Sequence, residues 1–156
     1  MVALDAVYPW QNCGEYSMSG RILGVDPGDK RIGIAVSDPT GMIANPLTVI
    51  QHVARAVDAA QIAALAAKHG AVKIVVGYPS DSEGELGPQG RKAQRLAEAL
   101  REQTELPVVL WDETGSTQAV RSARLEMGAR RAKRSGHLDE LAATFILQSY
   151  LDAGIV

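Results

Sequence analysis

Three acidic side chains, those of Asp26, Glu113 and Asp139, stand where a predicted strand ends or a predicted helix begins. Asp26 and Glu113 each end a short apolar run typical of a buried strand, and Asp139 opens the last predicted helix. Sites in α/β sheets cluster outside the carboxyl ends of parallel strands, so the three carboxylates could converge there. Converging carboxylates repel one another unless a cation lies between them, and hard oxygen ligands select Mg²⁺ or Mn²⁺. The three acids are therefore candidate ligands of a divalent metal.

Each of these acids, taken alone, also suits a structural role. Asp26 precedes a Pro-Gly turn, Asp112 or Glu113 suits the cap of a following helix, and Asp139 suits the start of the last one. The positions of Asp26 and Glu113 favour the functional interpretation, because an acid directly after an apolar run is less expected than an acid in a loop.

Other catalytic chemistries find little support in the sequence. His52, His69 and His137 are dispersed and Cys13 is the only cysteine, so no zinc-ligand cluster is present. The sequence has no Walker motif, no dinucleotide-binding glycine motif between a strand and a helix, and no serine or cysteine nucleophile motif. Covalent catalysis and P-loop chemistry are therefore disfavoured.

The elements that must position the acids follow from hydrophobic periodicity and turn residues. Three closely linked strands are expected first, and Pro46 places the third towards a sheet edge. Helices and strands then alternate, which predicts an α/β fold with a mixed five-stranded sheet, three antiparallel strands then parallel ones, and helices on both faces. The expected strands are 21–26, 31–38, 42–50, 71–79 and 107–113, and the expected helices are 53–70, 91–103, about 116–127 and 137–153, with a loop at 81–90.

Length and composition bound the organisation of the chain. It has 156 residues, of which 46% are hydrophobic and 22% charged, as expected of one globular domain. Residues 1–20 show no regular period, so we expect an N-terminal extension followed by a domain over 21–156. No apolar run is long enough to span a membrane, and the lone Cys13 fits a reducing cytoplasm.

Positive charge is concentrated before the last helix. The formal net charge of the chain is −2, but residues 121–134 contain six basic side chains and one acidic one. This run suits either a solvated helix end and loop or a surface that binds phosphate groups.

Several blocks of the sequence, taken together, resemble the YqgF/RuvX family of nucleases similar to Holliday junction resolvases. The resemblance covers residues 21 to about 153 and implies a ribonuclease-H-like fold. By position, it assigns the family's acidic triad to Asp26, Glu113 and Asp139. The blocks are ILGVDPGDKRIGIAVSD (22–38), VVGYP (75–79), VVLWDE (108–113) and LDELAATFILQSYL (138–151).

The mechanism implied by this resemblance is two-metal hydrolysis of phosphodiester bonds with Mg²⁺ or Mn²⁺. Asp26 would bridge both ions, and Glu113 and Asp139 would each help to hold one. The chain departs from the family pattern at Asp29, where the family usually has Thr, at 114–117, where it has R-L-T-T, and at 80–81, where it has Leu-Asn. Phosphate groups would be bound by Lys30, Arg31, Arg130, Arg131, Lys133 and Arg134.

Three function classes remain open from the sequence. The first is a nuclease of structured nucleic acid, acting either on the 5′ end of pre-16S rRNA or on branched DNA. The second is a catalytically silent nucleic-acid-binding module, and the third is a domain related to actin-like ATPases, for which 156 residues are too few. We expect a monomer or a weak homodimer, in which Tyr8, Trp10, Cys13 and Tyr16 of the extension would contribute to any interface.

Overall fold

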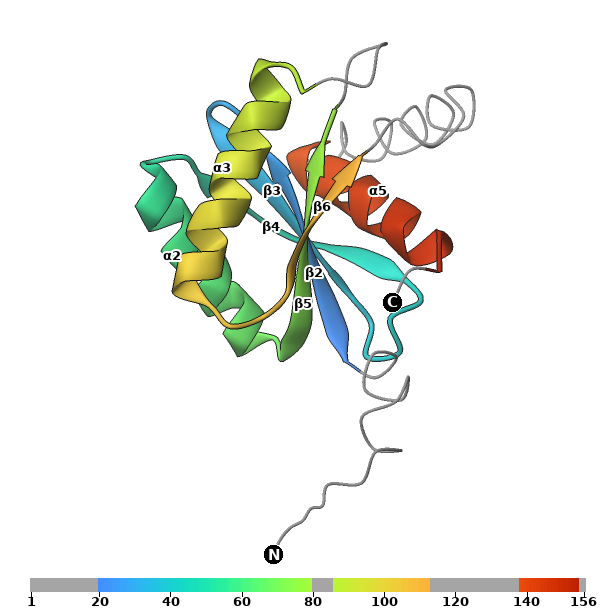
Figure 1. Cartoon of the computed structure of the whole chain (residues 1–156). Helices are drawn as coiled ribbons and strands as arrows, with labels where there is room; N and C mark the ends of the chain where they lie inside the picture. The colour runs from blue at the N-terminus through green and yellow to red at the C-terminus, as the bar shows by residue number, and fades with distance from the viewer. Residues whose placement is uncertain (1–19, 80–85, 113–137, 155–156) are drawn as a thin grey trace, which may run out of the picture.

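The computed structural model describes residues 20–79, 86–112 and 138–154. Its five-stranded sheet has the order β4-β3-β2-β5-β6 (Figure 1). β2 pairs antiparallel with β3 and β3 antiparallel with β4, whereas β5 lies parallel to both β2 and β6. The described elements are β2 (Arg21–Pro27), β3 (Arg31–Ser37), β4 (Ala44–Gln51), α2 (Arg55–Lys68), β5 (Ala71–Tyr78), α3 (Pro88–Gln103), β6 (Val108–Asp112) and α5 (Leu138–Asp152).

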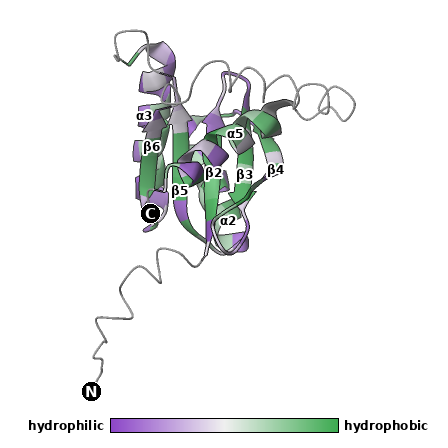
Figure 2. Ribbon diagram, turned by 90° about the vertical axis from the view of Figure 1, so that its right-hand side faces the viewer, coloured by the Kyte–Doolittle hydropathy of each residue, from purple (hydrophilic) through white to green (hydrophobic). Residues whose placement is uncertain are grey.

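Two hydrophobic layers, one on each face of the sheet, hold the fold together. Successive strand side chains point to opposite faces, so Leu23 and Val25 enter one layer and Ile22 enters the other. α2 and α3 cover the first face and α5 covers the second (Figure 1). Figure 2 shows the hydrophobic residues gathered along the strands between these helices. The predicted mixed sheet with helices on both faces is confirmed.

For the elements that the structure describes, the predicted boundaries agree to within a few residues. The largest difference is at α3, which begins at Pro88 rather than at 91. Proline at the first helical position costs nothing, because its missing N–H would have no partner within the helix. Pro46 lies on β4, the edge strand, next to a register shift against β3, as expected of a residue that cannot donate to the ladder.

The packing of α5 on the sheet requires glycine on two strands. A Cβ built on Gly24 of β2 would lie 2.7 Å from Leu147 Cβ, and one on Gly77 of β5 would lie 2.6 Å from Ile146 Cδ1. Neither distance leaves room for a side chain, so the two glycines let the helix lie close to the sheet.

The remaining sequence predictions fall partly outside the described residues. The proposed N-terminal extension lies outside them, except for Gly20. The helix expected over about 116–127 also lies outside them. In the described part of the chain, no helix is both long and apolar enough to cross a membrane.

Candidate active site at the carboxyl edge of the sheet

Asp26 lies near the carboxyl end of β2, half-buried, opposite Gly33 of the antiparallel neighbour β3. The residue before it, Val25, is fully buried and pairs in register with Val76 of β5. These buried, paired residues hold the Asp26 backbone in place at the carboxyl end of β2.

The parallel strands bring the end of β6 to the same edge. β5 and β6 run in register, with Tyr78 opposite Asp112, the last residue of β6. Glu113 itself lies outside the described residues but follows Asp112 directly.

The backbone of Asp139 lies in the first turn of α5. The other end of this helix is anchored at the opposite edge of the sheet. There the Gln148 side chain accepts a hydrogen bond of 2.9 Å from the Ala44 backbone N–H, and Lys73 Nζ donates one of 3.0 Å to the Tyr150 hydroxyl. The helix therefore begins near the carboxyl ends of the parallel strands (Figure 1).

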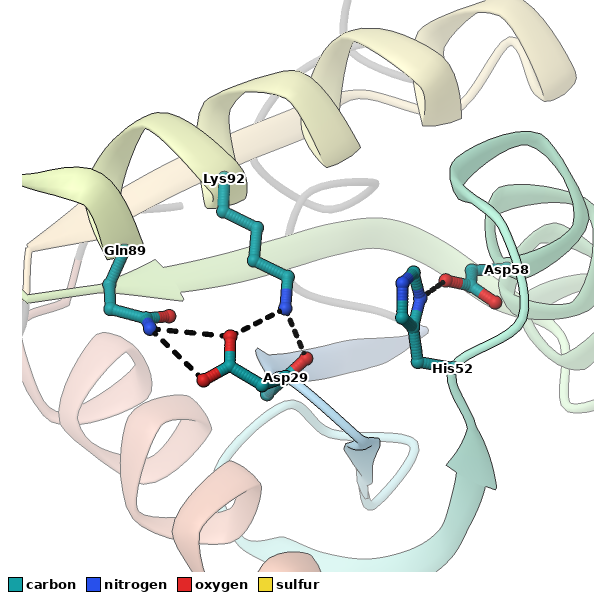
Figure 3. A network of polar contacts seen from close by, with 6 residues as sticks. Asp29, His52, Asp58, Gln89 and Lys92 are labelled. Carbon is teal, nitrogen blue, oxygen red and sulfur yellow. Dashed lines mark hydrogen bonds and ion pairs between the residues drawn. The ribbon is translucent and has the colours of Figure 1, made fainter.

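The β2–β3 turn carries Lys30 and Arg31 to this edge, where both side chains are exposed. The turn is bonded to α3: Lys92 Nζ lies 2.7 Å from the Gly28 carbonyl oxygen and 3.0 Å from Asp29 Oδ1 (Figure 3). Hydrogen bonds from Lys92 and from Gln89, together with the Lys92 charge, lower the pKa of the Asp29 carboxyl below its ordinary range.

A second polar pair lies beside the turn, where β4 leads into α2. Asp58 is 1% exposed, and its carboxylate forms a hydrogen bond with His52 Nδ1 (Figure 3). Its other oxygen accepts from the Val53 N–H at 3.0 Å. The backbone N–H of His52 in turn donates to the Lys30 carbonyl at 2.9 Å, which links this pair to the turn.

Tyr78, at the end of β5, reports on the electrostatics of the edge. Burial and then the negative charge of Asp112 raise its pKa above the ordinary value of about 10. The Asp112 carboxylate therefore places negative charge near the Tyr78 hydroxyl at this end of the sheet.

This donor chemistry fits a hard divalent cation, because the candidate ligands at the edge are carboxylates. Asp26 is the only one of the three whose side chain is described. Within the described residues, no three His, Cys, Asp or Glu side chains are grouped closely enough to hold a metal ion.

Some predicted site residues lie outside the described residues, and some residues of the observed site were not predicted from the sequence. The four basic residues expected to bind phosphate between positions 130 and 134 lie outside the described residues. Sequence reasoning did not single out Lys92, Gln89, Asp58 or Tyr78. Only Tyr78 left a usable signal, since it ends an apolar strand run as Asp26 does; the contacts of the others depend on the tertiary fold.

Comparison with known sequences identifies close relatives. A family model described as RuvX, Holliday junction resolvase, matches residues 20–153. A candidate pre-16S rRNA nuclease of Caldanaerobacter subterraneus subsp. tengcongensis is 44% identical over 134 residues, which cover 85% of this chain and 96% of the relative. A protein of the same name from Clostridium kluyveri is 42% identical over 132 residues, with the same coverage of both chains.

Solved structures show the same fold at low sequence identity. RuvC of T. thermophilus, in complex with a Holliday junction substrate, has a TM-score of 0.55 and 17% identity, over 86% of this chain and 94% of RuvC. The fowlpox virus resolvase, in complex with Holliday junction DNA, has a TM-score of 0.54 and 14% identity, over 87% of this chain and 99% of the resolvase. These similarities confirm the predicted ribonuclease-H-like fold.

Proposed function

This chain belongs to the family described as RuvX, Holliday junction resolvase, and we propose that it is a divalent-metal-dependent nuclease that hydrolyses phosphodiester bonds in structured nucleic acid. The observation that carries the proposal is the arrangement at the carboxyl edge of the sheet. There the end of β2 with Asp26, the end of β6 before Glu113 and the start of α5 with Asp139 lie at one edge.

In the proposed mechanism, the carboxylates of Asp26, Glu113 and Asp139 would hold two Mg²⁺ or Mn²⁺ ions, and Asp26 would help to hold both. When bound, the ions supply Lewis acidity that activates the attacking water and stabilises negative charge on the leaving 3′ oxygen. Asp26 suits the shared position because its backbone is fixed by the central pairing of β2 with both β3 and β5.

The basic residues of the chain would position the substrate by its phosphate groups. Lys30 and Arg31 are exposed at the same edge as Asp26, so they can contact the backbone of the nucleic acid near the scissile bond. Such contacts fix the orientation of the substrate without reading its sequence. The residues between 130 and 134 would extend the contact along the strand.

Pre-16S rRNA is the substrate we favour. The relatives at 42–44% identity carry that substrate in their name, whereas the junction-bound structures are similar to this chain at 14–17% identity. Branched DNA is the second candidate, because the matching family model bears the description of a Holliday junction resolvase. Trimming an RNA end needs one active site, so a monomer or a weak dimer in the cytoplasm would suffice.

A cleavage assay tests the proposal. The full chain is incubated with a precursor fragment containing the 5′ end of 16S rRNA, or with a four-way DNA junction, in the presence of Mg²⁺, Mn²⁺ or a chelator. We expect metal-dependent cleavage, with the RNA cut faster than the junction. Binding without cleavage in either metal would instead support the silent binding module. Hydrolysis of ATP with no effect on nucleic acid would support an ATPase.

A further inference from the structure

The β2–β3 turn is held by its carbonyl oxygens from two sides. From α3, Lys92 Nζ donates to the Gly28 carbonyl at 2.7 Å (Figure 3). From the end of β4, the backbone N–H of His52 donates to the Lys30 carbonyl at 2.9 Å. The turn that follows Asp26 is therefore bonded on both sides, to α3 and to the end of β4.

The bond from Lys92 is the stronger constraint on the α3 side. The Lys92 side chain is 32% exposed, whereas its ion-pair partner Asp29 is 74% exposed. An ion pair so open to water contributes little. The hydrogen bond from the Lys92 ammonium to the backbone carbonyl of Gly28 is charge-assisted and fixes the main chain itself. Gln89, one helical turn earlier, adds only long contacts of 3.4 and 3.5 Å to Asp29.

The turn is tight, and its other side is fixed independently of Lys92. A Cβ placed on Gly28 would lie 2.3 Å from the Arg31 carbonyl oxygen, so the backbone folds tightly over itself. On the other side, the buried Asp58 carboxylate holds both the His52 ring and the Val53 N–H, which fixes the backbone that bonds Lys30. Movement of the turn would therefore occur mainly on the side of Lys92.

We propose that Lys92 is a positioning residue, which locks the β2–β3 turn so that Asp26 and the exposed Lys30 and Arg31 face the substrate in one fixed arrangement. The proposal rests on the nuclease function proposed above. It assigns Lys92 no contact with the substrate, because its ammonium group is bonded to the Gly28 carbonyl and the Asp29 carboxylate.

Three variants of the full chain test this role. Lys92→Met removes the ammonium group and keeps most of the side-chain length, and Lys92→Arg keeps the charge and the donor. Arg95→Met removes one positive charge from an exposed position on the same helix and serves as the matched control. For each variant, hydrogen exchange of the segment 28–32 is measured by mass spectrometry, and kcat and KM are measured on the substrate that the unmodified chain cleaves.

Lys92→Met should raise exchange in the segment 28–32 by roughly tenfold, the effect of losing one hydrogen bond to a charged group. It should also lower kcat by about tenfold or more, because small displacements of reacting groups slow a reaction strongly. We expect KM to change by less than about threefold, since the Lys30 and Arg31 side chains of the turn remain available to the substrate. Lys92→Arg should recover both values, and Arg95→Met should change neither.

Two results would overturn the proposal. Unchanged exchange in Lys92→Met would show that Lys92 does not hold the turn. A raised KM at constant kcat would show that it binds the substrate directly. If the unmodified chain cleaves neither substrate, the proposed nuclease function fails, and the exchange measurement still decides whether Lys92 fixes the turn.

Discussion

Gly24→Ala should separate α5 from the sheet. The new Cβ would lie 2.7 Å from Leu147 Cβ and 3.3 Å from the Ala143 carbonyl oxygen. One of these atoms belongs to the helix backbone and the other is bonded directly to it, so a side-chain rotation cannot relieve the overlap. The helix as a whole must move away from β2, and its first turn carries Asp139.

The magnitude follows from the cost of adding a methyl group to a well-packed layer. Overpacking costs about 1–3 kcal/mol, and the rigid neighbours place this substitution at about 2–3 kcal/mol. For a chain of this length, the melting temperature should fall by roughly 4–12 °C. Cleavage should suffer more than stability, because a displacement of about 1 Å at a catalytic group can cost roughly 100-fold in rate.

The assay compares two glycines in double-mutant cycles, with unfolding in urea followed by circular dichroism. In Gly77→Ala the new Cβ would overlap three side-chain atoms of Ile146, at 2.6, 2.7 and 2.9 Å, all of which Ile146→Ala removes. In that background, Gly77→Ala should cost less than about 0.5 kcal/mol. Leu147→Ala, in contrast, leaves the overlapping Cβ in place and should not rescue Gly24→Ala.

Gly87→Ala is the matched control, because no atom lies within 4 Å of its added Cβ. It should cost about 0.5–1 kcal/mol, the effect of replacing an N-cap glycine by alanine. The reasoning is refuted if Gly24→Ala is no more destabilising than Gly87→Ala and cleaves at the normal rate. That result would mean that α5 does not lie against β2 at this distance.

Three further predictions concern charge. Hydrogen bonds from the Thr40 hydroxyl and from the backbone N–H groups of Ile43 and Met42 lower the pKa of Asp38 to about 2. The ionised Asp38 therefore stabilises the fold fully above pH 4, and this contribution is lost as the pH falls towards 2. Asp38→Asn should flatten that part of the curve of unfolding free energy against pH, measured by acid unfolding. Burial and the charge of Asp112 raise the pKa of Tyr78. The neutral Tyr78 therefore contributes fully to the stability of the fold below pH 10, and this contribution is lost as the pH rises further. Tyr78→Phe should remove this loss of stability in alkaline unfolding. Each alanine substitution in the basic run at 130–134 should reduce the slope of log binding constant against log salt concentration by roughly 0.9 on duplex DNA. The slope is measured by fluorescence titration. An unchanged slope would place the substrate on another face of the protein. The substituted residues are Arg130, Arg131, Lys133 and Arg134.

Local sequence patterns were sufficient to predict most of the fold. Apolar β-branched runs and turn residues located the strands, and Pro46 located the edge strand. Both predictions were possible because they depend only on residues that are neighbours in the sequence. Loop composition concealed the first turn of α3, where Gly87 and Pro88 suggested a turn and in fact begin the helix.

The candidate site was predictable only in part, because some of its contacts join residues that are far apart in the sequence. Asp26 stands out because an acid ends an apolar run, which is visible locally. Lys92 does not stand out, because a lysine on an amphipathic helix usually faces solvent. Its bond to Gly28 joins residues 64 positions apart and exists only once α3 lies across the sheet.

The central claim is that the carboxyl edge of the sheet holds a metal-dependent nuclease site, and cleavage by Asp26→Asn tests it most directly. Glu102→Gln, which removes one negative charge from an exposed position on α3, is the matched control. Asp26→Asn should unfold at a temperature no lower than that of the unmodified chain, because in the proposed site it removes one of three like charges. Its cleavage in Mg²⁺ or Mn²⁺ should fall to the level seen with a chelator, whereas Glu102→Gln should cleave normally. Full metal-dependent cleavage by Asp26→Asn would contradict the claim.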